Sequence, residues 1–110
     1  MQTETLYCVR FWISPEGRDT VLHWLDTTHM ADVVSQPGFR WMKRIKLAED
    51  ADDGWLAYMM IYGLESQAAL AAYFDSPATR RYADERKPFA HHLRTERWWG
   101  DVDHAIPATR

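Results

Sequence analysis

His29 is the residue in this sequence best suited to acid–base chemistry, and its spacing predicts that it faces the protein interior. Steps of four residues lead from Val21 through Leu25 to His29, so these side chains share one stripe of a helix. An imidazole with an ordinary pKa near about 6.5 can accept or donate a proton on a bound small molecule. We therefore predict that His29 is a catalytic acid or base. The alternative is a structural histidine bonded to a backbone carbonyl or to Asp32.

Aromatic rings are the candidates to surround a ligand beside His29. The chain holds six Trp, five Tyr and four Phe. A phenol near His29 can donate a proton to a carbonyl or enolate oxygen, and we predict Tyr58 as this second catalytic residue. Flat apolar walls suit an aromatic or polyketide-like molecule. The rings predicted to bind it are Trp24, Trp41, Tyr73 and Trp98. The alternative for each ring is a place in the core or in a subunit interface.

Arginines in predicted strands bear on the charge of the ligand. Arginines in such strands include Arg10, Arg40, Arg44 and Arg97. A partly buried guanidinium needs an anion, which Glu96 or the acidic loop at residues 48–54 can supply. An arginine left unpaired in the cleft would favour a carboxylate or phenolate ligand, and Arg40 is assigned to the predicted site on this basis. Residues 80–81 and 86–87 are interpreted as a solvated, cationic helix face.

Other kinds of chemistry find little support in the sequence. His91 and His92 are neighbours in a segment predicted to be extended, so they should point to opposite sides, and we expect no metal site. The glycine-rich loops and nucleophile motifs of nucleotide-binding and acyl-transfer enzymes are absent, which predicts a protein without a cofactor. The net charge of −3 argues against nucleic acid or an anionic membrane as partner. One cysteine, Cys8, and the lack of a signal-like or membrane-spanning stretch lead us to expect a cytoplasmic protein.

The pattern of hydrophobic residues predicts one α+β domain over residues 1–110, with its core in residues 6–102 and a polar tail at 103–110. Strands are predicted at residues 6–13, 39–47, 55–62 and 92–102. A long helix is predicted at residues 18–34 and a second helical region at 66–86, broken near Asp75. The order β-α-β-β-α-β is that of the ferredoxin-like fold, an antiparallel sheet with both helices on one face.

The third predicted strand should be apolar on both of its faces, although helices cover only one face of the sheet. A symmetric contact between two sheets would cover the other face. We therefore predict an obligate homodimer. The alternative is a monomer whose exposed aromatic surface binds another protein.

Several short motifs resemble the dimeric α+β barrel superfamily. They are Trp24-x4-His29-x7-Pro37-Gly38-Phe39 and Glu65-Ser66-x3-Leu70-x2-Tyr73-x2-Ser76-Pro77. Within the superfamily the chain is most similar to small domains of unknown function near the EthD-like group. The resemblance implies a dimeric barrel and agrees with a histidine at position 29 that faces the cleft. The superfamily includes monooxygenases, haem-degrading enzymes, isomerases, cyclases and dehydratases, so fold alone does not select the chemistry.

The function predicted from these residues is proton transfer on a small aromatic or polyketide-like molecule, without a cofactor. Isomerisation, cyclisation, elimination and oxygenation all fit this description. A non-catalytic ligand-binding or stress-associated dimer is the first alternative. A haem-binding or haem-degrading protein, with His29 or His91 as axial ligand, is the second.

Overall fold

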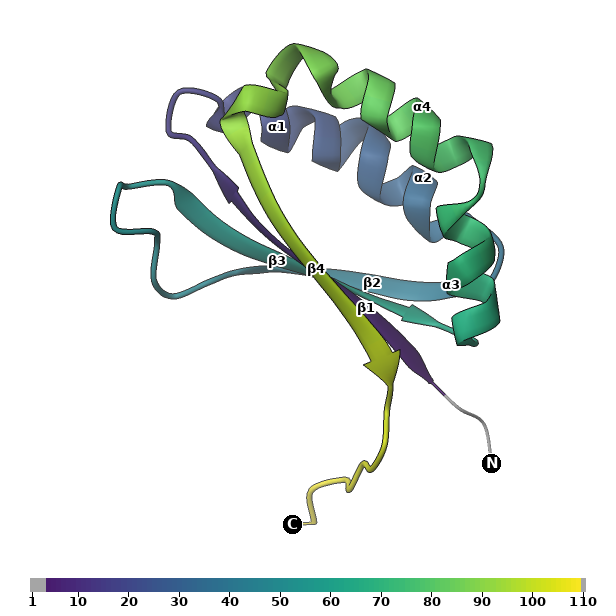
Figure 1. The fold of residues 1–110 in the computed structure, drawn as a ribbon. Coiled ribbons are helices and arrows are strands. Elements are labelled where there is room, and N and C mark those ends of the chain that lie inside the picture. The colour runs from purple at the N-terminus through teal and green to yellow at the C-terminus, as the bar shows by residue number, and fades with distance from the viewer. Residues whose placement is uncertain (1–3, 110) are drawn as a thin grey trace.

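The computed structural model describes residues 4–109, which form a four-stranded antiparallel sheet with its helices on one face (Figure 1). The strands are β1 (Thr5–Ile13), β2 (Phe39–Lys46), β3 (Leu56–Leu64) and β4 (Leu93–Asp101). The helices are α1 (Arg18–Trp24), the π-helix η1 (Leu25–His29), α2 (Met30–Val34), α3 (Gln67–Phe74), α4 (Pro77–Arg86) and the 3-10 helix η2 (Lys87–His92). The strand order is β2-β3-β1-β4. The predicted α+β ferredoxin-like fold is confirmed. No helix in the described range is long and apolar enough to cross a lipid bilayer.

The two central strands, β1 and β3, supply most of the core on the helix-covered face. Alternate residues of β1, from Thr5 to Ile13, are buried there, and their neighbours in the sequence are half-buried on the other face. Phe11, which is 2% exposed, stacks on Tyr58 of β3 with ring centroids 5.3 Å apart. This alternation defines a helix-facing side and an outer side of the sheet.

The first helical region contains a π-helical turn that ends at His29. The backbone N–H of Met30 donates to the carbonyl of Leu25, five residues earlier. In a regular α-helix, side chains four residues apart differ in direction by about 40° around the helix axis, so a long series of them leaves one face. The wider π turn compensates for this rotation, so Val21, Leu25, His29 and Val33 are all buried. The predicted inward orientation of His29 is confirmed.

Strand β2 contains a β-bulge that the alternating sequence pattern did not predict. Phe39 pairs with Leu64 and Trp41 pairs with Gly63, so Arg40 is an extra residue between them. Simple alternation along the predicted strand at residues 39–47 would place Phe39 and Trp41 on one face, and the bulge makes that expectation wrong. Phe39 packs on the rings of the core, whereas Trp41 lies on the outer side.

The second helical region begins at Ser66, as predicted. The Ser66 hydroxyl accepts a hydrogen bond from the backbone N–H of Ala69, which caps α3. The chain breaks at Asp75, and α4 starts with Pro77 as its first residue. Ser76 occupies the N-cap position, but its hydroxyl donates to the Tyr73 carbonyl and does not cap α4.

Two glycines with positive φ allow a direct test of the loop geometry. Gly38 has φ of 87°, and a Cβ atom there would lie 2.5 Å from the Cβ atom of Ala69. Gly54 has φ of 91°, and a Cβ atom there would meet nothing within 4 Å. Gly54→Ala should cost about 1–2 kcal/mol of stability for the backbone conformation alone. Gly38→Ala should cost a further ~1–3 kcal/mol for the collision. Urea unfolding of both variants measures these costs, and equal losses would contradict the close approach of α3 to this loop.

Candidate functional site

A cavity of about 290 Å³ lies between the helices and the helix-facing side of the sheet. Its walls are rich in aromatic residues and include seven of them: Tyr7, Phe11, Trp24, Tyr62, Tyr73, Phe74 and Tyr82. Three side chains that can carry a positive charge also line it, namely His29, Arg86 and Arg97. Apolar walls with a few convergent polar groups are typical of small-molecule sites.

His29 is held in this cavity by two rings. It is 7% exposed, it stacks on Trp24 with centroids 4.2 Å apart, and the ring of Tyr82 meets it edge-on at 4.5 Å. Its Nδ1 atom is buried without a hydrogen-bond partner among the described residues. Buried polar atoms are seldom left unpaired in folded proteins. Because His29 is one of the residues that line the cavity, a molecule bound there can contact its imidazole.

Burial also determines the charge of His29. Burial is the main cause that lowers the pKa of the imidazole to about 4, and the positive charge of Arg86 contributes to the same decrease. Arg97 acts in the same direction, while the carboxylate of Asp32 raises the pKa and only partly offsets these effects. The imidazole is therefore neutral at pH 7 and can accept a proton.

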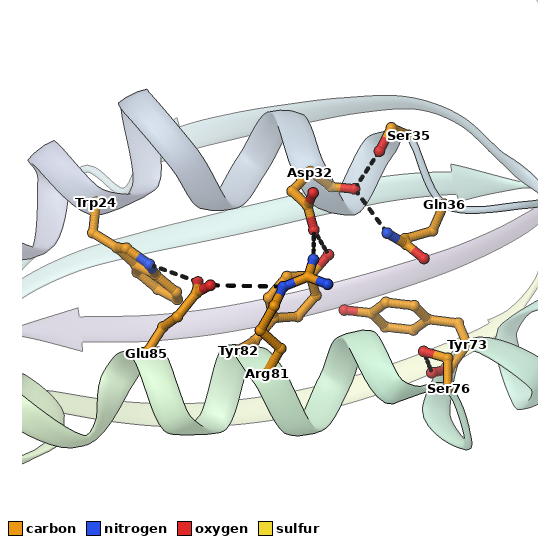
Figure 2. Close-up of polar contacts among 9 residues, drawn as sticks. All are labelled: Trp24, Asp32, Ser35, Gln36, Tyr73, Ser76, Arg81, Tyr82 and Glu85. Carbon is orange, nitrogen blue, oxygen red and sulfur yellow. Dashed lines mark hydrogen bonds and ion pairs between the residues drawn. The ribbon is translucent and has the colours of Figure 1, made fainter.

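The cavity tyrosines are protonated at neutral pH. Burial is the main cause that raises the pKa of Tyr7, Tyr62, Tyr73 and Tyr82. The hydroxyl of Tyr82 donates to the carboxylate of Asp32, which also raises its pKa. The hydroxyl of Tyr73 forms no hydrogen bond with the described residues and is free to donate (Figure 2).

A polar network joins α1 and α2 to α4 and includes two cavity residues, Trp24 and Tyr82 (Figure 2). Trp24 Nε1 donates to Glu85 Oε1 at 3.1 Å, and Glu85 also pairs with Arg81 at 3.7 Å. The Arg81 guanidinium and the Tyr82 hydroxyl both donate to the carboxylate of Asp32. Since Trp24 and Asp32 come from α1 and α2 and the other three from α4, the network joins the two helical regions that cover the sheet.

Three residues predicted for the site line the cavity together: His29, Trp24 and Tyr73. Trp24 and His29 are in direct contact. Tyr73, which is 9% exposed, packs against the ring of Tyr82 at 6.5 Å. The sequence pattern therefore located the helical part of the cavity.

Four other predicted residues lie elsewhere. Tyr58 is on the helix-facing side but outside the cavity, stacked on Phe11 and covered by two cations of β2. Trp41 is on the outer side, where its Nε1 donates to Glu4 at 3.1 Å. Arg40 is exposed at the bulge. Trp98 is 45% exposed on the outer side, opposite Cys8. The prediction that these four surround the ligand with His29 is not supported by their positions.

The prediction for the neighbouring histidines is also corrected. His91 and His92 lie in the 3-10 helix η2, not in an extended strand, and their ring centroids are 4.0 Å apart. The Nδ1 atom of His92 is 2.6 Å from the hydroxyl of Ser14. This contact anchors η2 to the end of β1.

Two arginines of the cavity were not assigned to the site from the sequence. Arg86 was interpreted as part of a solvated face, yet it follows the buried residues Ala78 and Tyr82 at four-residue steps on α4. Arg97 pairs with Val9, a core residue of β1, so it must lie on the helix-facing side. The four-residue spacing and the strand register are the signals that would have identified them.

Comparisons with solved structures show the same fold at low sequence identity. SnoaB, a cofactor-independent oxygenase from Streptomyces nogalater, matches 96% of this chain and 98% of its own, with 17% identity and a TM-score of 0.66. An EthD family protein from Bacillus halodurans matches 87% and 96%, with 16% identity and a TM-score of 0.65. HapK from Hahella chejuensis matches 96% and 99%, with 15% identity and a TM-score of 0.66. These chains share the ferredoxin-like α+β arrangement of this protein, which supports the predicted fold.

Comparisons at the level of sequence give a family but no activity. No curated protein matches the sequence. The sequence profile of one family matches residues 4–97, which is most of the chain. The chain therefore belongs to the family described as Domain of unknown function (DUF4286).

Proposed function

We propose that this protein is an enzyme that transfers a proton to and from a small aromatic or polyketide-like molecule without a cofactor, with His29 as the base. One observation carries the proposal: the Nδ1 atom of a buried histidine, in the wall of an aromatic cavity, has no partner in the described part of the chain. A neutral imidazole at this position can accept a proton from a carbon next to a carbonyl group.

Tyr73 complements His29 in this reaction. When a proton leaves the carbon for the imidazole nitrogen, negative charge develops on the carbonyl oxygen of the substrate. The Tyr73 phenol stays protonated and can donate a hydrogen bond to this oxygen. Isomerisation, cyclisation, elimination and oxygenation with O₂ all proceed from such an enolate. Tyr73 thus replaces Tyr58, which lies outside the cavity, in the predicted role of the phenol.

The comparisons support this class of reaction through one relative. SnoaB is described as a cofactor-independent oxygenase, which shows that the shared fold can host such chemistry. At 17% identity the likeness concerns the fold, so the proposal rests on the cavity residues.

We also propose that the working form is a homodimer. The outer side of the sheet carries apolar side chains across its full width, from Ile45 on β2, 42% exposed, to Trp98 on β4, 45% exposed. Met59 and Ile61 of β3 lie between them and are only half-buried. Figure 1 shows that no helix covers this side. A second copy of the same sheet would cover it through a symmetric contact.

Exchange of a carbon-bound proton tests the proposed reaction without knowledge of the natural substrate. The probe is 2-tetralone, a bicyclic ketone whose protons next to the carbonyl exchange with D₂O once they are abstracted. The wild-type protein should accelerate deuterium uptake, measured by ¹H NMR, and His29→Gln should lose about 100-fold of this acceleration. The control His23→Gln replaces an exposed histidine of the same helix and should behave as wild type. Equal exchange with wild type and His29→Gln would refute the role of His29.

A further inference from the structure

Arg86 and Arg97 line the cavity and form no ion pair with the described residues. Arg86, at the end of α4, is half-buried, and Arg97 lies on the helix-facing side of β4. Other arginines of the described chain form ion pairs: Arg18, Arg44, Arg81 and Arg94. Neither cavity arginine pairs with a carboxylate of residues 4–109. Arg10, Arg40 and Arg80 have no such pair either, but they do not line this cavity.

The two guanidinium groups are close enough to affect each other and the rest of the cavity. Burial lowers the pKa of Arg86, and the charge of Arg97 lowers it further. Both charges also lower the pKa of His29 and partly offset the effect of burial on the pKa of Tyr7. Two like charges beside one apolar cavity repel each other, and an anion between them would offset this repulsion.

We infer that the molecule bound in this cavity is an aromatic carboxylate, whose carboxylate group binds Arg86 and Arg97 while its rings lie among the cavity tyrosines and Trp24. The inference rests on the proposed function, because it concerns the same site and names the class of substrate. A guanidinium offers paired N–H donors that match the two oxygens of a carboxylate. The cavity volume of about 290 Å³ suits a molecule of one or two rings.

Binding of a carboxylate would also prepare His29 for catalysis. The charged groups that face His29 are Asp32 from α2, Arg86 from α4 and Arg97 from β4, with the neutral phenol of Tyr82 against its ring. An anion at the arginines offsets the two positive charges that lower the pKa of the imidazole. His29 therefore becomes a stronger base when the substrate is bound.

Calorimetry with a matched pair of ligands tests the inference. The probes are 2-naphthoate and 2-naphthamide, which have the same shape and differ in charge. The wild-type protein should bind 2-naphthoate at least tenfold more tightly than 2-naphthamide. Arg86→Gln and Arg97→Gln should each weaken binding of 2-naphthoate about tenfold and leave binding of 2-naphthamide unchanged. The control Arg80→Gln, on the exposed face of the same helix, should bind both probes as wild type does.

Three outcomes would overturn the inference: equal affinity for the two probes, no binding of 2-naphthoate, or a preference for 2-naphthoate over 2-naphthamide that both arginine variants retain. Arg97 is largely exposed, so Arg97→Gln should remain folded, and Arg97→Lys should retain part of the preference because it keeps the charge. Exchange on 2-tetralone does not involve a carboxylate, so that assay decides the role of His29 separately. The His29→Gln variant keeps both arginines and should therefore still bind 2-naphthoate more tightly than 2-naphthamide.

Discussion

The free energy of unfolding should fall by about 2 kcal/mol between pH 7 and pH 5, and by about 3 kcal/mol by pH 4, because of His29 alone. The imidazole has a pKa of about 4 in the folded protein and near about 6.5 in the unfolded chain. Between these values the unfolded chain binds the proton and the folded protein does not. Acid therefore favours unfolding over this range, and below pH 4 the contribution is fully lost.

The comparison of two variants isolates this effect from other titrating groups. His29→Gln removes the titration, so urea unfolding measured from pH 7 to pH 4 should show a dependence on pH that is shallower by about 3 kcal/mol. His23→Gln removes an exposed histidine on the same helix and should keep the steep dependence of the wild type. An identical dependence in His29→Gln and wild type would show that His29 has the same pKa in the folded protein as in the unfolded chain, which would contradict its burial as a neutral imidazole.

Ile61→Asp should convert the proposed dimer into a monomer and raise its dissociation constant at least about 1,000-fold. Ile61 is in the middle of β3 on the outer side, paired with Cys8 of β1 and Lys43 of β2. In a symmetric interface the change places two carboxylates at the contact, and each costs several kcal/mol when removed from water. Sedimentation equilibrium at micromolar concentration measures the change in mass.

Two controls make this result specific. Ala83→Asp adds the same charge to an exposed position on α4 and should leave the wild-type mass unchanged. Trp98→Asp changes a more exposed residue of the outer side and should also weaken the dimer while the protein stays folded, as judged by circular dichroism. A wild-type chain that is a monomer at micromolar concentration would contradict the proposed dimer.

Local patterns in the sequence were sufficient to predict the fold. Residues 18–34 were predicted as one helix, and the four-residue steps placed His29 correctly inside the protein. In the structure, residues four apart stay on one buried face because the helix contains a π turn. The four-residue spacing therefore identified the buried residues correctly, although it did not predict the irregular turn.

The residues that complete the site depend on features with little local signal. The bulge at Arg40 places Phe39 and Trp41 on opposite sides, and a simple alternation cannot reveal it. Arg97 can be assigned to the cavity only once β4 is known to pair with β1 in its observed register. Arg86 resembles a surface arginine in composition, and the packing of α4 over the sheet is what brings it to the cavity.

The central claim is that His29 is a neutral, buried proton acceptor in a ligand cavity. A ¹H–¹⁵N NMR titration of the imidazole nitrogens tests it most directly, with His29→Gln used to assign the signals. We predict a midpoint near pH 4 in the free protein. A midpoint at or above about pH 6.5, the ordinary value for histidine, would contradict the account, since His29 would then be solvated or paired with an anion.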